Sequence, residues 1–123
     1  MFELVIRGEF AASHRIKGHN GKCKNLHGHT WKVEAVLLAS RLNSIGLTVD
    51  FKILKKTLDT FLDQLDHSYL NDLPFFKTKN PSTENIAKFI FEGLAKQFRP
   101  LRLKQVTVWE SDRAGLTYYS RRI

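Results

Sequence analysis

The sequence predicts an α+β fold in which an antiparallel four-stranded sheet carries two helices on one face. Two patterns predict it: apolar residues alternate near both ends of the chain, as in half-buried strands, and recur at helical spacing in the middle. The expected order is therefore strand, strand, helix, helix, strand, strand. With 123 residues the chain has the size of one ordinary domain, and we expect residues 1–123 to form a single one.

The first predicted strand runs from Phe2 to His14. One of its faces is lined by the residues of one parity, which are Phe2, Leu4, Ile6, Phe10, Ala12 and His14. Gly8 interrupts this row and is a candidate for a bulge. Because a bulge resets the parity of a strand, the face on which His14 lies depends on the conformation at Gly8.

A polar loop over residues 15–26 carries Cys23 and leads to the second predicted strand, residues 27–37. Alternation places on one side of this strand the residues His27, His29, Trp31, Val33, Ala35 and Leu37. Both histidines therefore point the same way.

Two amphipathic helices follow a turn near residues 43–46. Asp50 is a good N-cap for the first helix, expected over residues 51–65, and Ser82 or Thr83 can cap the second, with Glu84 in its favourable first turn. The apolar stripe of the first helix consists of Leu54, Leu58, Phe61, Leu62 and Leu65, and that of the second of Ile86, Ile90, Leu94 and Phe98. Pro100 ends the second helix.

The last part of the chain predicts an antiparallel hairpin. The segments KQVTVWE (104–110) and GLTYYSR (115–121) alternate as strands do, and the turn-like SDRAG joins them. Glu110 ends the first of these strands on the face of Val106 and Val108. A carboxylate in such an apolar setting needs a partner, for example the two N–H groups on the edge of a planar heterocycle, unless the strand end is open to solvent.

Composition limits the possible functions of the chain. The formal charge is +8, from 20 Lys and Arg against 12 Asp and Glu, which predicts attraction to polyanions. Nucleic acid, a phosphate-bearing small substrate and a merely solvated surface all fit, but the scattered positions of the cations disfavour nucleic acid. No apolar run approaches the roughly 20 residues of a membrane span, and the charged start is unlike a signal peptide, so we expect a cytoplasmic protein.

Three histidines are candidate ligands of a zinc ion. His27 and His29 lie at i and i+2 of one strand, roughly 6.5 Å apart at the backbone, and His14 ends the neighbouring strand. Three histidines would leave a fourth position open for water or substrate, as in catalytic zinc sites. Cys23 allows a different assignment, a closed structural site of one cysteine and three histidines, and spacing alone leaves both open. His19 is expected at the surface.

A weaker candidate site, for proton transfer, consists of two neighbouring residues that follow the first helix. Asp66 precedes His67, and a carboxylate can orient and charge an imidazole for proton transfer. Neighbouring residues on a strand point apart, so this pair requires a turn or a helix end. Helix-terminal capping is the alternative explanation.

Six ordered motifs together resemble one protein family. They are FAASHR, C-x-x-x-HGH, VDFxxLK, LDHxxLND, NPSTEN and VTVWES, which cover the chain from about Phe10 to Tyr119. In this order and at these separations they resemble the 6-pyruvoyltetrahydropterin synthase and 6-carboxytetrahydropterin synthase family. The resemblance implies the tunnelling fold, with ββααββ subunits that assemble as a homohexamer of two trimers and build active sites between subunits.

The resemblance also implies roles for individual residues. It implies Zn²⁺ on His14, His27 and His29, and a catalytic role for Cys23. It implies further that Asp66 and His67 act with Cys23 in proton transfer, contributed by a neighbouring subunit, and that Glu110 anchors a pterin ring. Ser82, Thr83 and Glu84 match a motif that borders the pterin pocket.

The spacing around the cysteine bears on the reaction. Three residues, KNL, separate Cys23 from the HGH pair, which resembles bacterial 6-carboxytetrahydropterin synthases of the queuosine pathway, whereas the SH of FAASH is shared with the pyruvoyl branch. The implied substrate is 7,8-dihydroneopterin triphosphate, and Lys17, Lys22 and Lys24 are candidates for attracting its phosphates. The pyruvoyl synthase and a non-enzymatic basic module that binds RNA are the alternatives.

Overall fold

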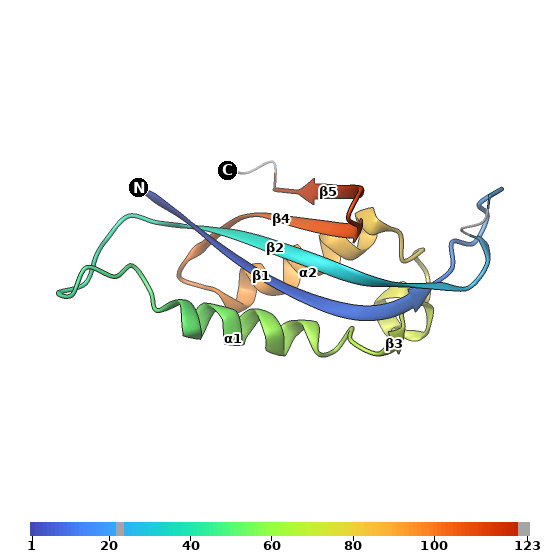
Figure 1. The fold of residues 1–123 in the computed structure, drawn as a ribbon, viewed down its shortest axis with the longest axis horizontal. Helices are drawn as coiled ribbons and strands as arrows, with labels where there is room; N and C mark the ends of the chain where they lie inside the picture. The colour runs from blue at the N-terminus through green and yellow to red at the C-terminus, as the bar shows by residue number, and fades with distance from the viewer. Residues whose placement is uncertain (22–23, 121–123) are drawn as a thin grey trace.

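The computed structural model describes residues 1–21 and 24–120. Its elements, in chain order, are β1 (Phe2–His14), β2 (His27–Ala39), α1 (Phe51–Leu62), β3 (Ser68–Tyr69), the 3₁₀ turns Leu70–Asp72 and Pro74–Phe76, α2 (Thr83–Gln97), β4 (Arg102–Ser111) and β5 (Ala114–Tyr118). One long twisted sheet runs the length of the molecule, as Figure 1 shows. The predicted α+β class and the order of the long elements are confirmed.

The sheet has five strands in the order β3-β1-β2-β4-β5, so the predicted count of four is wrong. The four long strands pair antiparallel, as expected. The additional strand, β3, is only two residues long and pairs parallel with β1, through Ala12 with Ser68 and Ser13 with Tyr69. A segment this short has no alternation from which it could be predicted.

The register of β1 and β2 is continuous from the pair Phe2 and Ala39 to the pair His14 and His27. Gly8 therefore forms no bulge, and His14 keeps the parity of the buried row. The missing side chain of Gly8 serves the packing of α1 instead. A Cβ atom at this position would lie 3.0 Å from Cδ1 of Leu62 and 3.2 Å from Cδ2 of Leu58.

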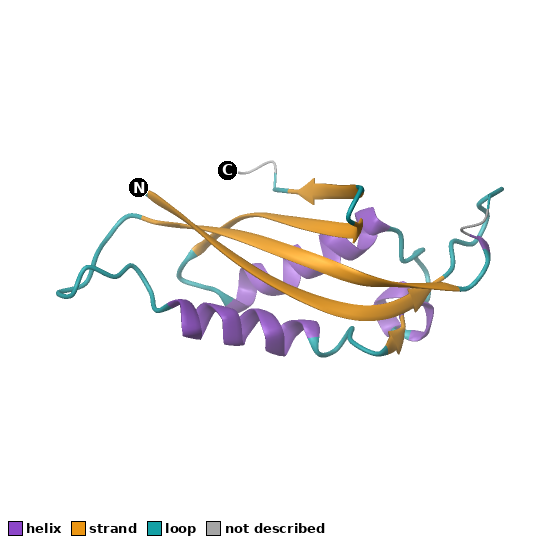
Figure 2. Cartoon of the chain, in the orientation of Figure 1, coloured by secondary structure: helices purple, strands orange, loops and turns teal. Residues whose placement is uncertain are grey.

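Both helices cover the same face of the sheet, as Figure 2 shows, and the main core lies between the two layers. Asp50 caps α1 by accepting a hydrogen bond from the backbone N–H of Lys52, and Ser82 caps α2 by accepting one from Asn85. The predicted apolar stripes supply the helical part of this core. Its fully buried members include Leu58, Leu62, Ile86, Ile90 and Leu94.

Helix α1 ends at Leu62, three residues before the predicted end at Leu65. Leu65 is still fully buried, which explains why it shares the helical spacing. The chain turns after Leu62, because the backbone N–H of both Leu65 and Asp66 donates to the Leu62 carbonyl. This turn directs Asp66 and His67 towards the edge of β1.

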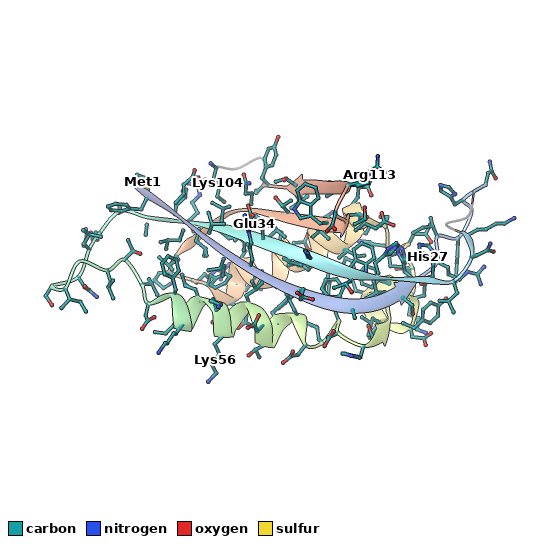
Figure 3. The ribbon with its side chains drawn as sticks, in the orientation of Figure 1. Met1, His27, Glu34, Lys56, Lys104 and Arg113 are labelled. Carbon is teal, nitrogen blue, oxygen red and sulfur yellow. The ribbon has the colours of Figure 1, made fainter. Side chains whose placement is uncertain are left out.

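Different elements lie at the two ends of the molecule. Figure 3 places His27 at the end opposite Met1. Residues 15–21 and 24–26, the start of α2 and the short strand β3 lie at the His27 end, whereas the loop between β2 and α1 projects from the other end (Figure 1). No helix in the described part of the chain has the length and apolar character needed to cross a membrane.

Candidate metal centre

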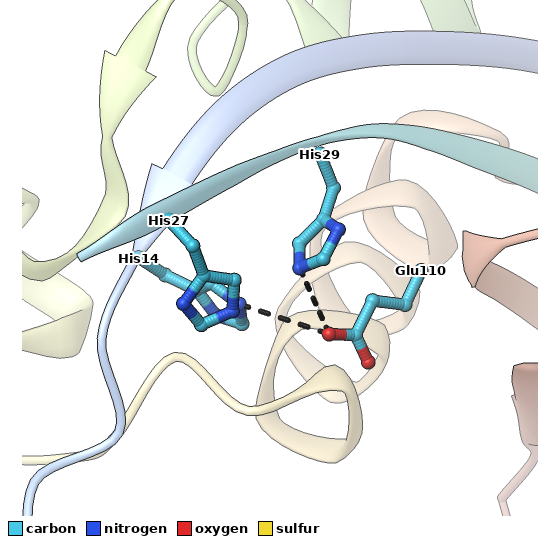
Figure 4. Close-up of side chains that lie close together, drawn as sticks. All are labelled: His14, His27, His29 and Glu110. Atoms are coloured by element: carbon cyan, nitrogen blue, oxygen red, sulfur yellow. Dashed lines mark ion pairs between the residues drawn. The ribbon is translucent and has the colours of Figure 1, made fainter. Parts of the chain in front are cut away.

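The register of β1 and β2 brings three histidines together on the helix-covered face. His14 pairs directly with His27, and Ala12 pairs with His29, so the third imidazole lies diagonally across from the first. The ring centroids are 4.4 Å apart for His14 and His27, 4.8 Å for His27 and His29, and 5.3 Å for His14 and His29. Figure 4 shows the rings converging on one point.

Backbone carbonyls orient two of these rings. Nδ1 of His14 lies 2.7 Å from the carbonyl oxygen of Pro81, and Nδ1 of His27 lies 2.7 Å from that of Asn25. A carbonyl only accepts hydrogen bonds, so Nδ1 of each ring is the protonated, donating nitrogen. In the neutral form of each ring this leaves Nε2 with a free lone pair, which is the state in which histidine binds a metal ion.

The cluster lies partly in the protein interior. His14 is 2% exposed, and the fully buried ring of Trp31 packs beneath it at a centroid distance of 4.9 Å. Burial lowers the pKa of His14 and of His29 and so favours the neutral form of both rings. Among the described residues, neither Nε2 makes a hydrogen bond of regular geometry, although the carboxylate of Glu110 lies beside both.

Glu110 completes the cluster from β4. Its Oε1 lies 2.9 Å from Nε2 of His29 and 3.9 Å from Nε2 of His14, and its Oε2 accepts a 3.3 Å hydrogen bond from Oγ1 of Thr83. The parity of Val106 and Val108 indicated this face correctly. The contact with the histidines was not predicted, because strand parity does not show which residues two separate strands bring together.

These side chains fit a divalent transition-metal ion. Each of His14, His27, His29 and Glu110 offers one ligand atom, and all four atoms lie within 4.8 Å of one another. Imidazole nitrogens and carboxylate oxygens are accepted ligands of zinc and related ions. The buried Nε2 atoms of His14 and His29 make no regular hydrogen bond among the described residues, and a metal ion would satisfy both.

The start of α2 brings one of its three predicted residues to the cluster. Thr83 contacts Glu110, as described. Ser82 uses its hydroxyl to accept the hydrogen bond from Asn85 that caps the helix. Glu84 is exposed in the first turn. The carbonyl of Pro81, one residue before the cap, orients His14, so the NPSTEN segment supports the cluster from two sides.

Asp66 and His67 form the expected pair at a turn. Nδ1 of His67 lies 2.8 Å from Oδ2 of Asp66, and the backbone of His67 adopts the left-handed conformation, with φ of 56°. Oδ1 of Asp66 accepts a 2.8 Å hydrogen bond from the backbone N–H of Ala11, which lowers the pKa of the carboxyl. The His67 side chain is 83% exposed, and this pair is not among the four residues of the metal cluster.

Two asparagines that the sequence analysis did not single out hold the chain just after His14. The side-chain amide of Asn71 accepts from the N–H and donates to the carbonyl of Arg15, both at 3.0 Å, and Asn80 does the same for Lys17 at 2.9 Å. They lie within the motifs LDHSYLND and NPSTEN.

The remaining predicted residues are Cys23, His19 and the three lysines of the loop. Cys23 and Lys22 fall outside the described residues, so the cysteine's position relative to the metal cluster stays a prediction. His19 is exposed, as expected, and its Nδ1 accepts a hydrogen bond from the backbone N–H of Gly21. Lys17 and Lys24 are also exposed.

Comparison with known proteins agrees with this architecture. The model of the 6-pyruvoyl tetrahydropterin synthase family matches residues 3–121. A 6-carboxy-5,6,7,8-tetrahydropterin synthase from Synechocystis sp. is 35% identical over 128 residues, covering 100% of this chain and 97% of its own. A dihydroneopterin monophosphate aldolase from Pyrococcus furiosus is 34% identical over 114 residues, covering 92% of this chain and 93% of its own.

A solved structure supports the same assignment. The 6-pyruvoyl tetrahydropterin synthase of Caenorhabditis elegans superposes with a TM-score of 0.86 at 30% identity, covering 97% of this chain and 95% of its own. Fold and site define an α+β protein whose sheet presents a cluster able to hold a metal ion. The chain belongs to the 6-pyruvoyl tetrahydropterin synthase family.

Proposed function

We propose that the protein is a zinc-dependent carbon–carbon lyase that converts 7,8-dihydroneopterin triphosphate and one water molecule into 6-carboxy-5,6,7,8-tetrahydropterin, acetaldehyde and triphosphate, for queuosine biosynthesis. The observation that carries this proposal is the convergence of three histidines, two of which have a buried Nε2 atom without a regular hydrogen bond among the described residues. The similarity to the Synechocystis sp. 6-carboxytetrahydropterin synthase and the KNL spacing after Cys23 favour the carboxy product.

His14, His27 and His29 would hold the zinc ion, which supplies a Lewis acid that makes hydroxyl groups of a bound substrate more acidic. The carbonyls of Pro81 and Asn25 keep the Nε2 atoms of His14 and His27 in the acceptor state that ligation requires. Trp31 closes the floor beneath the rings and excludes water from that side.

Glu110 would orient the pterin ring. A carboxylate accepts two N–H groups from the edge of such a ring, and Glu110 lies at the end of β4 beside the histidines. Thr83 holds one carboxylate oxygen, and Ser82 and Glu84 border the same helix start. Fixing the ring at this point would bring its side chain towards the metal cluster.

Cys23, Asp66 and His67 would move protons on the substrate side chain. In the Asp66–His67 pair the carboxylate lies on Nδ1 of the imidazole, which leaves Nε2 free to take or return a proton. The exposure of His67 supports a role in the site of a neighbouring subunit, in a homohexamer of two trimers. In this proposal residues 1–123 form one tetrahydropterin-synthase-like domain that works in the cytoplasm.

Product analysis tests the reaction directly. Purified zinc-loaded protein is incubated with 7,8-dihydroneopterin triphosphate, and the products are identified by mass spectrometry. We expect 6-carboxytetrahydropterin together with acetaldehyde, whereas 6-pyruvoyltetrahydropterin would assign the pyruvoyl reaction instead. A parallel incubation with dihydroneopterin monophosphate examines the aldolase reaction of the Pyrococcus furiosus relative. Cys23→Ala should keep the zinc and lose turnover, whereas joint loss of zinc would support the structural cysteine site.

The alternative function, RNA binding without catalysis, predicts binding of RNA and no turnover of a pterin. The net charge of +8 would then serve RNA, and binding would weaken steeply as salt is raised. Salt-sensitive RNA binding together with no turnover of either pterin would replace the lyase proposal.

A further inference from the structure

Glu110 faces two demands that a single carboxylate cannot meet at once. The proposed function, on which this inference rests, requires both carboxylate oxygens for the N–H groups of a pterin ring. In the structure both oxygens are already engaged. Oε1 lies against Nε2 of His29 and His14, and Oε2 accepts from Thr83.

We propose that Glu110 is the fourth ligand of the metal ion in the substrate-free protein, and that the pterin ring displaces it. The carboxylate would close the coordination sphere until substrate arrives. Its transfer to the ring would then open one position on the metal for the substrate side chain. Ring binding and exposure of the metal would thereby become one event.

The distances between the ligand atoms are close to those that a tetrahedral site would require. Zinc–nitrogen and zinc–oxygen bonds of about 2.0–2.2 Å place neighbouring ligand atoms roughly 3.3–3.5 Å apart in a tetrahedron. Oε1 of Glu110 lies 2.9 Å from one Nε2 and 3.9 Å from another, on either side of this value. All four ligand atoms lie within 4.8 Å of one another, so small side-chain movements would complete the site.

The hydrogen bonds around the cluster also distinguish Glu110 from the histidines. The rings of His14 and His27 are held by backbone carbonyls, whereas Glu110 is held by one side-chain hydroxyl at 3.3 Å. A carboxylate with so little support is suited to exchange between two partners. The three imidazoles provide the permanent attachment.

The backbone at Glu110 supports such exchange. Trp109 pairs with Gly115 and Ser111 pairs with Ala114, so Glu110 is the extra residue where the register of β4 and β5 shifts. A bulge of this kind redirects a side chain and leaves its residue outside the regular ladder. The bulge, and not the regular pairing of β4 with β5, therefore determines the direction of the Glu110 side chain.

Charge gives the exchange a measurable consequence. A carboxylate neutralises one of the two charges of the metal ion and so strengthens its binding in a half-buried site. If the ring removes this carboxylate, ring binding must weaken metal binding, and the metal must weaken binding of the ring by the same factor. A pterin without side-chain hydroxyls reports this coupling alone, because it offers the metal no replacement ligand from the side chain.

The experiment compares wild type with Glu110→Gln, which keeps the shape and removes the charge. Zinc affinity is measured by competition with a chromogenic chelator, and coordination by the visible spectrum of the Co²⁺-loaded protein, each with and without unsubstituted pterin. Asp112→Asn is the matched control, since this exposed carboxylate on the same chain segment pairs only loosely with Lys32, at 3.7 Å. Circular dichroism confirms that each variant is folded.

We expect Glu110→Gln to bind zinc about tenfold or more weakly, since even partners outside the ligand set commonly contribute that much. Asp112→Asn should match wild type. Unsubstituted pterin should change the Co²⁺ spectrum of wild type and leave that of Glu110→Gln unchanged. Equal zinc affinity and identical Co²⁺ spectra for wild type and Glu110→Gln would overturn the inference, as would pterin binding that leaves the wild-type spectrum unchanged. The zinc measurement involves no substrate, so absence of turnover, which would refute the proposed function, is a separate result.

Discussion

The metal cluster and the Asp66–His67 pair are two groups of polar side chains held in different ways. His14, His27 and His29 come from two strands of 13 residues each, paired without interruption, and His14 is 2% exposed. Asp66 and His67 are neighbours in a turn, and the His67 side chain is 83% exposed. The cluster depends on the register of the sheet, and the pair on one left-handed residue at its edge.

This difference corresponds to different chemical demands. Metal ligands must be in place before the ion arrives, and a long ladder of backbone hydrogen bonds positions them with little freedom. A proton-transfer pair must reach a substrate, so exposure is useful and local hydrogen bonds are sufficient. The exposure of His67 therefore supports the proposal that the pair serves the active site of a neighbouring subunit.

The largest effect is expected from breaking the cluster. His14→Ala removes a ligand and leaves the buried Pro81 carbonyl without its donor. We expect zinc affinity to fall by more than about 100-fold and the free energy of unfolding of the metal-free protein to fall by about 1–3 kcal/mol. Chelator competition and urea unfolding measure the two effects.

His19→Ala is the matched control for this variant. His19 is exposed, and within the described residues its side chain bonds only to the backbone N–H of Gly21. It should therefore leave zinc affinity and stability near the wild-type values. Retention of full zinc affinity and turnover by His14→Ala would remove the histidine cluster as the metal centre.

The pair should respond in the opposite way, with loss of turnover and little change in metal binding or stability. His67→Asn removes the imidazole but keeps a residue that tolerates the left-handed backbone conformation. We expect turnover to fall by about 10²–10⁴-fold and stability to stay within about 0.5 kcal/mol. Steady-state kinetics and urea unfolding provide the readouts. Wild-type turnover in His67→Asn would leave the pair a purely structural turn.

The contrast between the regions also explains what the sequence predicted. Alternation over two long strands was sufficient to place the three histidines on one face, and the absence of a bulge at Gly8 kept His14 in that row. Helical spacing located both helices, although Leu65 extended the first one too far because its buried side chain lies in a turn. Periodic signals identify long elements because every residue in them contributes.

Contacts between distant segments were not predictable in this way. The two-residue strand β3 exists because the turn after α1 meets the edge of β1, and the contact of Glu110 with His29 depends on the packing of β4 beside β2. The asparagine bonds to Arg15 and Lys17 span 56 and 63 residues of sequence. Such pairings follow from the tertiary fold, and a local pattern carries no information about the partner.

The asparagines connect the two regions, and removing them tests that connection. Asn71 follows the pair by four residues and holds Arg15, the residue after His14. Asn71→Ala leaves two backbone groups without partners, and because Asn71 is buried we expect a loss of about 1–3 kcal/mol. Asn80→Ala should cost less, since its bonds to Lys17 are exposed to water. Equal losses for the two variants in urea unfolding would show that burial does not determine the effect.

The smallest expected effect is a pH dependence carried by Asp66. The hydrogen bond from the backbone N–H of Ala11, aided by His67, holds the pKa of the Asp66 carboxyl below its ordinary value of 3.8. Because the pKa is lower in the folded than in the unfolded state, the ionised carboxylate stabilises the fold above the unfolded value. This stabilisation is lost as the pH falls through the folded value.

The stability difference between wild type and Asp66→Asn isolates this contribution, because the other carboxylates titrate in both proteins. Measured by urea unfolding, the difference should stay level near pH 5 and shrink below about pH 4. Repeating the series at 1 M NaCl separates the two partners, since salt screens the exposed attraction to His67 far more than the hydrogen bond from Ala11. If salt abolishes the stability difference between the two proteins, charge alone holds the Asp66–His67 pair. The hydrogen bond from Ala11 would then not position the turn, and the contrast with the metal cluster would have to be revised.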